Sequence, residues 1–296
     1  MKGFGEEEKA RKKKLKKTTS QNQTLINLAI NLHSQGEIEE ASKYYKYCIK
    51  QGFNDPKVFS NYGTILHSEG KLIEAEFSTR KAIKLNNNFA DAYCNLGNIL
   101  NDLSKSKEAE VSYREAIKLN PDFINAHFNL GNMLKNQGRL KEAEVSYRKA
   151  TELKPNFISA HLNLGDILKV QGKLNEAESS FRKVIKLNPR LAEAHLNLGN
   201  ILQSLGRLKE AESSTRRTIE LNPNFAEAHL NLGNILQNLE NFKLAENSYR
   251  KAIQLKPNFK EAHIIFSIFL RNIGKLKDAE VFTRKAIKLN PGLAEV

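Results

Sequence analysis

Residues 192–225 read AEAHLNLGNILQSLGRLKEAESSTRRTIELNPNF, and most of the chain consists of variants of this 34-residue stretch. Stepping by 34 residues from Asn22 gives eight consecutive copies, which fill residues 22–293. The repeats are 22–55, 56–89, 90–123, 124–157, 158–191, 192–225, 226–259 and 260–293. A fixed period of this size is typical of proteins that stack one supersecondary unit many times.

Each repeat has the pattern of two helices. Its first half is apolar except for a narrow polar stripe at positions 2, 6, 9 and 13, so we expect a helix covered on nearly all sides. Its second half is apolar on one face and charged elsewhere, which indicates a half-exposed helix. A glycine at position 15 favours a tight turn between them, and Asn-Pro at positions 31 and 32 ends the second helix. Asn224 with Glu227, and Asn258 with Glu261, are expected to cap the following first helices.

Individual positions of the repeat resemble the tetratricopeptide repeat (TPR). The fourth repeat carries the residues of that pattern at His127, Leu130, Gly131, Leu134, Ala143, Tyr147, Ala150 and Pro155. Departures are local, for example Thr79, Thr215 and Thr283 at the aromatic position. The resemblance implies an all-α TPR solenoid, a right-handed superhelix of helix-turn-helix repeats. Small residues such as Gly199 and Ala211 are expected where two helix backbones approach closely.

An asparagine row follows the polar stripe of the first helices, which should line the inner face of the solenoid. Position 6 holds Asn27, Asn61, Asn95, Asn129, Asn163, Asn197 and Asn231, and position 9 adds Asn98, Asn132, Asn200 and Asn234. An amide offers both donors and an acceptor, which match a peptide backbone. Helices packed about 8–10 Å apart would meet about every third residue of an extended chain. We therefore predict a peptide-binding groove whose amides are solvated in the free protein, although duplication of a neutral polar residue also explains the row.

This row resembles the asparagine ladder in the TPR superhelix of protein O-GlcNAc transferases. The sequence carries no glycosyltransferase domain. We therefore predict a non-enzymatic scaffold that binds a flexible protein segment or peptide. The alternative is the substrate-recruiting arm of a transferase, glycosyltransferase-like, whose catalytic part is missing or on another chain.

Other side-chain patterns do not predict chemistry. The five histidines at position 4 occur once per repeat, too far apart to share a metal ion, and are expected to fill the core; they are His127, His161, His195, His229 and His263. Pairs such as Glu76/Arg80, Glu144/Arg148 and Glu212/Arg216 are expected to support the outer helix. No catalytic set or cofactor motif is evident, so we predict neither metal nor cofactor.

Charge argues against specific nucleic-acid binding despite a net charge of +14. The inner stripe carries four basic residues, Lys57, Lys135, Lys169 and Arg271. Six acidic ones oppose them: Asp91, Asp102, Asp166, Glu193, Glu227 and Glu261. A groove that follows phosphates should be basic. Lysine or arginine at positions 5 and 6, used by TPR clamps for chaperone tails, is also missing.

Both ends of the chain depart from the repeat. Residues 1–21 are predicted to be a basic disordered tail, and residues 294–296 start a truncated ninth repeat. The eighth repeat carries Ile265 and Ile268 on the inner stripe and Val281, Phe282 and Ile287 on its second helix. These residues predict self-association or covalent continuation at the C-terminal end. Without a signal peptide, a transmembrane segment or a disulfide framework, we expect a cytoplasmic protein.

Overall fold

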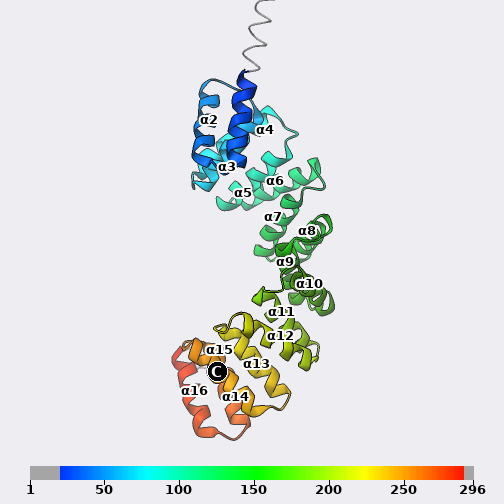
Figure 1. Ribbon diagram of the computed structural model, residues 1–296, viewed down its shortest axis with the longest axis vertical. Coiled ribbons are helices and arrows are strands. Elements are labelled where there is room, and N and C mark those ends of the chain that lie inside the picture. The colour runs from blue at the N-terminus through cyan, green and yellow to red at the C-terminus, as the bar shows by residue number, and fades with distance from the viewer. Residues whose placement is uncertain (1–20, 290–296) are drawn as a thin grey trace, which may run out of the picture. The chain divides into compact units, whose positions relative to one another are not determined.

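A computed structural model describes residues 21–289 of the chain (Figure 1). The first 20 residues of the predicted tail and the predicted start of a ninth repeat lie outside this range. The described residues contain helices and turns and no β-strand, which confirms the all-α architecture. No helix among them is long and apolar enough to cross a lipid bilayer.

Each repeat folds into two antiparallel helices. Residues 21–34 are helical and form the first helix of the first repeat. The other first helices are α3 (Pro56–Ser68), α5 (Ala90–Asp102), α7 (Ile124–Asn136), α9 (Ile158–Val170), α11 (Ala192–Ser204), α13 (Ala226–Asn238) and α15 (Lys260–Asn272). The second helices are α2 (Ile38–Lys50), α4 (Leu72–Leu85), α6 (Ser106–Leu119), α8 (Leu140–Leu153), α10 (Leu174–Leu187), α12 (Leu208–Leu221), α14 (Phe242–Leu255) and α16 (Leu276–Leu289).

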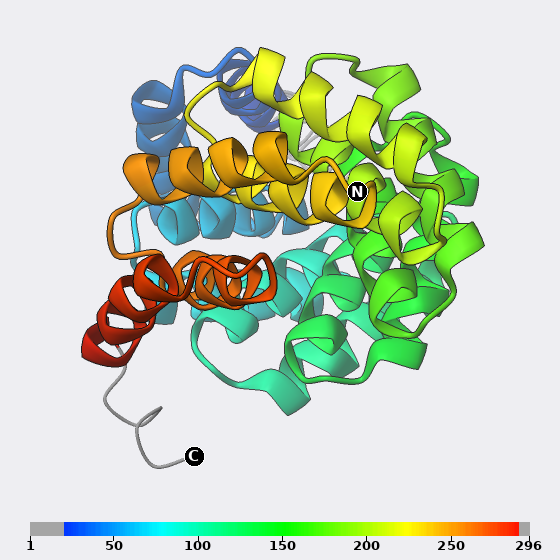
Figure 2. The same cartoon turned by 90° about the horizontal axis from the view of Figure 1, so that it is seen from below.

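The helices form two compact blocks. The N-terminal block comprises the described residues up to Lys154, and the C-terminal block begins at Pro155. Within each block a second helix packs against the first helix of its own repeat and against the first helix of the next one. The last hairpin of the C-terminal block consists of α15 and α16, drawn in dark orange and red in Figure 2 after the lighter orange α14. Each block is therefore a stack of hairpins that bury one another's apolar faces, as in a solenoid.

Glycine at position 15 makes the turn between the two helices of a repeat, as predicted. Six of these glycines have φ between 74° and 84°, a conformation that costs other residues energy: Gly36, Gly70, Gly138, Gly172, Gly206 and Gly274. Ser104 and Glu240 occupy the same position with φ of 60°. The turn geometry is thus imposed by the fold even where glycine is missing.

The predicted asparagine caps are wrong. The residue before α13 is Phe225 and the residue before α15 is Phe259, and neither helix has a side-chain cap. Asn224 instead donates its backbone N–H to the side chain of Asn222 in the preceding turn, at 3.3 Å. An apolar residue stands before the first helix at this position, buried at Phe259 and half-buried at Phe225. Among helices α2 to α15 only α3 has a side-chain cap at its start: Asp55 accepts from the backbone N–H groups of Lys57 and Val58.

Close approach of the two helices within a repeat explains the small residues at positions 8 and 20. A Cβ atom placed on Gly97 would lie 2.6 Å from the ring of Tyr113, and one on Gly199 would lie 2.5 Å from the hydroxyl of Thr215. Ala109 and Ala211 at position 20 are fully buried. The expected close contact is confirmed.

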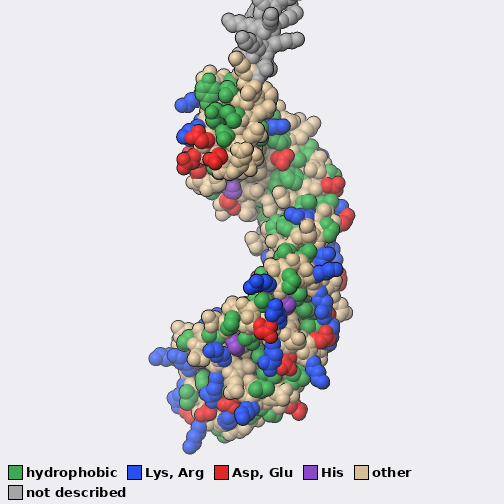
Figure 3. All heavy atoms as spheres, viewed as in Figure 1, with side chains coloured by type: hydrophobic (Ala, Val, Ile, Leu, Met, Phe, Trp, Pro, Cys, Tyr) green, Lys and Arg blue, Asp and Glu red, His purple; other side chains and the backbone are tan. Residues whose placement is uncertain are grey.

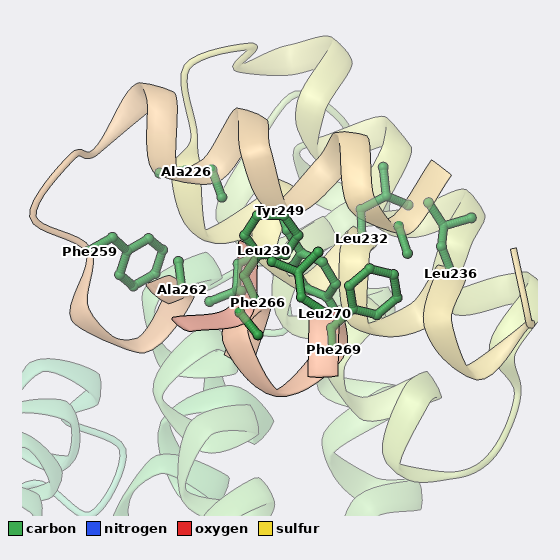
Figure 4. Close-up of a cluster of buried hydrophobic side chains, with 13 residues drawn as sticks. Ala226, Leu230, Leu232, Leu236, Tyr249, Phe259, Ala262, Phe266, Phe269 and Leu270 are labelled. Carbon is green, nitrogen blue, oxygen red and sulfur yellow. The ribbon is translucent and has the colours of Figure 1, made fainter. Parts of the chain in front are cut away.

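The core of the last repeats is a continuous aromatic cluster (Figure 4). Tyr249 of α14 packs against both Phe266 and Phe269 of α15, with ring centroids 5.6 Å and 5.2 Å away. Leu230 and Leu236 of α13 belong to the same cluster. Tyr249, Phe266 and Phe269 are almost fully buried, and such rings contribute strongly to packing energy.

Candidate functional site

The predicted asparagine row lies on the first helices. Asn61, Asn95 and Asn129 in the N-terminal block are half-buried, as are Asn163, Asn197 and Asn231 in the C-terminal block. Asn27 is exposed and accepts a hydrogen bond from Gln23 at 3.0 Å. The position-9 residues Asn98, Asn132, Asn200 and Asn234 are also half-buried. We call the surface that carries these residues within each block the inner face.

Position 6 of one repeat is hydrogen-bonded to position 9 of the preceding repeat. Asn129 Nδ2 donates to Asn98 Oδ1 at 2.8 Å, and Asn231 Nδ2 donates to Asn200 Oδ1 at 2.7 Å. The expectation that these amides are solvated in the free protein is therefore wrong. A half-buried donor needs a partner, and the preceding repeat provides it.

Tyrosine at position 24 extends this network into the core. The hydroxyl of Tyr113 donates to Asn98 Oδ1 at 2.8 Å, and that of Tyr147 donates to Asn132 Oδ1 at 2.7 Å. Burial raises the pKa of Tyr113, so its hydroxyl keeps the proton that it donates. Asn98 Oδ1 thus accepts two hydrogen bonds, which fills the capacity of a carbonyl oxygen.

The row is not uniform at its other members. Asn95 donates to the hydroxyls of Ser60 and Thr64, both at 3.2 Å, and Asn61 donates to the hydroxyl of Tyr45 at 3.1 Å. Asn197 makes no side-chain hydrogen bond with any other residue in the range 21–289. Asparagine at position 6 therefore forms hydrogen bonds within the protein in some repeats, whereas the side-chain amide of Asn197 forms none with the described residues.

Several row members meet in one hollow of the N-terminal block, with a volume of about 280 Å³. Asn98, Asn129 and Asn132 line it, and the first helices α3, α5 and α7 supply most of its wall. The remaining lining residues are His67, Asn101, Asp102, Tyr113, Met133 and Asn136. Eight of the nine lining side chains carry polar atoms, so the hollow suits a hydrogen-bonding ligand rather than an apolar one.

Free hydrogen-bonding capacity remains in this hollow. The Nδ2 group of Asn98 has no acceptor and the Oδ1 atom of Asn129 has no donor within residues 21–289. His67 Nε2 lies 2.7 Å from Asp102 Oδ2, a contact that joins two repeats at the rim. Burial raises the pKa of Cys94, below Asn129, to about 12, so this thiol stays neutral and unreactive near pH 7. The hollow can therefore bind a polar group but offers no nucleophile.

Histidine at position 4 has a role that the sequence did not reveal. In five repeats its Nε2 lies 2.8–3.1 Å from the carbonyl oxygen of the proline six residues earlier. The ring N–H donates, because a carbonyl can only accept. Four of these side chains are half-buried and His263 is buried, so they are not simple core residues. The constant spacing of six residues between proline and histidine was the available signal. Within residues 21–289 no group of potential ligand side chains is arranged to hold a metal ion.

Ion pairs connect the second helices on the opposite surface, which we call the outer face. The predicted pairs within a helix are confirmed: Arg80–Glu76 at 2.8 Å, Arg148–Glu144 at 2.9 Å and Arg216–Glu212 at 2.9 Å. Arg80 also reaches Glu108 of the next repeat at 2.6 Å. Lys105 of that next repeat reaches back to Glu76 at 2.8 Å. These pairs connect neighbouring second helices, and Figure 3 shows acidic side chains mixed with more numerous basic ones on the visible surface of the C-terminal block.

Comparisons with known proteins agree with this architecture. Two family models described as tetratricopeptide repeat match residues 90–123, 192–225, 226–259 and 112–145, and one described as TPR repeat matches 131–172 and 165–206. Together they cover residues 90–259 without a gap. A search of the curated proteins finds no match.

Solved structures of repeat proteins are similar to parts of the chain. YrrB, described as a TPR protein with an unusual peptide-binding site, is 27% identical over 62% of this chain and 95% of its own, with a TM-score of 0.58. MamA is 26% identical over 56% of this chain and 98% of its own, with a TM-score of 0.51. The C-terminal part of a TPR repeat-containing protein from Cytophaga hutchinsonii covers 80% of this chain and 97% of its own. With a TM-score of 0.67 and 17% identity, it supports the fold alone.

Proposed function

The chain belongs to the tetratricopeptide-repeat family and is a protein–protein interaction scaffold; from that premise we propose that its inner face binds an extended segment of a partner protein. The observation that carries the proposal is the polar hollow lined by Asn98, Asn129 and Asn132. In that hollow one amide has its donors free and another has its acceptor free. A peptide backbone presents the same two groups at every residue except proline.

The internal hydrogen bonds support this role because they fix the amides before a ligand arrives. Asn129 cannot rotate freely while it donates to Asn98, and Asn98 is fixed in turn by Tyr113. A pre-oriented amide loses less side-chain entropy when it binds. Since the same residue recurs in successive repeats, the row recognises backbone rather than side chains and tolerates many sequences.

The comparison with YrrB is consistent with the proposal, because that protein is described as having a peptide-binding site. The site belongs to YrrB, and its residues are not transferred to this chain. What this chain contributes is its own row of asparagines, Asn27, Asn61, Asn95, Asn129, Asn163, Asn197 and Asn231, with the position-9 residues beside it.

A selected peptide tests the proposal. Peptides that bind the full chain can be chosen from a random displayed library, synthesised and measured by fluorescence anisotropy. Methylation of backbone nitrogens along such a peptide should weaken binding by about twofold to tenfold for each hydrogen bond lost, since one net bond contributes roughly 0.5–1.5 kcal/mol. Replacing the peptide's own side chains by alanine, one at a time, should have smaller effects.

Two protein variants separate the roles of the asparagines. Asn197→Ala removes an amide that has no internal partner among the described residues, so it should weaken peptide binding and leave the melting temperature unchanged. Asn129→Ala should weaken binding and also lower stability by roughly 1 kcal/mol, because Asn98 loses a donor. If both variants and the methylated peptides bind as tightly as the parents, the row is not the binding site.

A further inference from the structure

The outer face of the N-terminal block carries an apolar strip at position 22 of the repeat. Phe77 of α4 is 77% exposed, and Val111 of α6 and Val145 of α8 are each 68% exposed. The residues at this position in the next three repeats are Ser179, Ser213 and Asn247. Single exposed apolar residues are ordinary, but one at the same position in three successive repeats forms a row of apolar side chains on the outer face.

Ion pairs show that the three helices of the strip are neighbours. Arg80 of α4 contacts Glu108 of α6 at 2.6 Å, and Arg114 of α6 contacts Glu142 of α8 at 3.0 Å. Ile73, one turn before Phe77 on α4, is 65% exposed and widens the strip. We call Ile73, Phe77, Val111 and Val145 the outer strip.

Two hollows border the outer strip. One, of about 600 Å³, is lined by Ile73 and Phe77 of α4 and by apolar side chains of α2 and α3, including Ile49 and Tyr62. The other, of about 640 Å³, lies between α4, α5 and α6; its apolar lining residues are Ile83, Tyr93, Leu96, Leu100 and Val111. Hollows of this size on either side of α4 can accept large apolar side chains from a partner.

The charge around the strip is mainly positive. Lys84 and Lys107 line the second hollow, and Lys141 lies one turn before Val145; none forms an ion pair with another residue in the range 21–289. The acidic residues of that hollow are matched, Glu108 by Arg80 and Glu115 by Lys118. Near the first hollow the unpaired groups are Lys46 and Glu74, which offset each other. The surface therefore combines exposed apolar residues with uncompensated lysines.

We propose that the outer strip docks an acidic amphipathic helix of a partner protein. The three helices pack on first helices and are joined to one another by ion pairs of long side chains. Their spacing therefore exceeds that of directly packed helices, and a docked α-helix can match it because each turn advances about 5.4 Å. A helix laid across α4, α6 and α8 can thus place one apolar side chain at each of them, with carboxylates beside the lysines. A second copy of this chain is a poor occupant, because two such faces would oppose their lysines.

A synthetic peptide tests this surface independently of the inner face. The probe is a fluorescein-labelled helical peptide with leucines at three- and four-residue spacing and glutamates elsewhere; its control has lysines in place of the glutamates. Fluorescence anisotropy with the full chain should show binding of the acidic peptide. Phe77→Ser with Val111→Ser should weaken that binding by about tenfold or more, since two buried side chains are lost.

Matched variants complete the experiment. Val170→Ser, on first helix α9, removes a side chain that is also 68% exposed and should change nothing. Lys107→Glu with Lys141→Glu should abolish binding of the acidic peptide and allow the lysine peptide to bind. Because all these side chains are exposed, unchanged circular dichroism and melting are expected for every variant.

Three results would overturn the proposal: the acidic peptide fails to bind the parent chain, the Phe77→Ser and Val111→Ser variant binds it as tightly as the parent does, or Val170→Ser weakens binding as much as that variant does. Vesicles of phosphatidylserine and phosphatidylcholine form a further arm. If the serine substitutions reduce binding to these vesicles but not to the peptide, the strip recognises a membrane surface and not a helix. This test does not depend on the proposed function, because a failure of the inner face to bind peptides would not change binding of the acidic helix to the outer strip.

Discussion

At the scale of single residues, the turn at position 15 shows how the fold imposes a backbone conformation. Glu240 has φ of 60° where six other repeats have glycine. A non-glycine residue in the left-handed region costs roughly 1–2 kcal/mol of stability. Replacing it by glycine removes this cost, but the greater freedom of glycine in the unfolded chain offsets part of the gain. We expect Glu240→Gly to raise the free energy of unfolding by about 0.5–1 kcal/mol, as measured by urea denaturation.

The reverse substitution is the control for this turn. Gly206→Ala, at φ of 76°, should lower the free energy of unfolding by roughly 1 kcal/mol. An unchanged denaturation midpoint in both variants would show that the turn conformation stores no strain.

Residue patterns predicted more of the fold than of the site. Gly97 and Ala109 are small because the two helices of one repeat approach closely there. Small residues therefore recur at positions 8 and 20 and can be recognised in the sequence. The partner of Asn129 is Asn98, 31 residues earlier, and that pairing depends on how one hairpin stacks on the next. The bond from His161 to the carbonyl of Pro155 depends likewise on the path of a loop. Periodicity gives the helices, but it does not give the direction in which a polar side chain points.

His161 connects this loop to the dependence of stability on pH. Burial lowers the pKa of His161 below its ordinary value of 6.5, against the opposing effect of its bond to Pro155. Burial also lowers the pKa of His33. The unfolded chain therefore takes up protons on these residues at a higher pH than the folded protein does. Stability should be complete above about pH 7 and should fall as the pH drops through about 6.5 towards 5.5.

Melting curves between about pH 5.5 and 7.5 measure this effect. Carboxylates do not contribute to the change in melting temperature in this pH range. A residue such as Glu110, whose pKa is lowered by hydrogen bonds from Arg139, titrates below its ordinary pKa of 4.5. His33→Gln with His161→Gln should flatten the profile. A profile as steep as that of the parent would mean that other groups cause the pH dependence.

At the scale of helices, the ion pairs between second helices are interrupted once within the C-terminal block. The position-25 arginine of one repeat pairs with position 19 of the next, as Arg182 does with Glu210 at 3.2 Å. Position 16 of the later repeat pairs with position 21 of the earlier one, as Lys275 does with Glu246 at 2.7 Å. In the seventh repeat Asn241 and Leu244 occupy the partner positions, so Arg216 and Glu212 pair only with each other.

Restoring the missing pairs is a direct test of their contribution. Asn241→Lys with Leu244→Glu should raise the free energy of unfolding by about 0.2–1 kcal/mol for each pair formed, because exposed pairs are weak. Leu244 is 48% exposed, so the second substitution buries no new charge. The gain should disappear near 1 M salt, where the screening length falls to about 3 Å. A gain that persists at high salt would instead come from helix propensity.

At the scale of the whole molecule, the same repeat produces different surfaces in the two blocks. The outer strip is apolar in the N-terminal block, whereas in the C-terminal block the matching positions are polar in three repeats, at Ser179, Ser213 and Asn247, and apolar again only at Val281 of the last one. A stack of hairpins permits this because each second helix presents its outermost position to solvent whatever the residue. The core positions, by contrast, stay small or apolar throughout. Shared positions such as the asparagine row and differing positions such as the outer strip therefore define two separate candidate surfaces of one fold.

The last repeat carries the prediction that concerns assembly. Ile265 and Phe282 pack against the aromatic cluster, whereas Ile268, Leu276, Val281 and Ile287 are 37–65% exposed. Exposed apolar residues grouped on one hairpin favour association with a matching surface. We expect the chain to self-associate through this hairpin, with an average mass that rises with concentration in light scattering. Val281→Glu with Ile287→Glu should make it monomeric. Ser213→Glu, at the same repeat position as Val281, should not change its mass, and a monomeric parent at all concentrations would contradict the prediction.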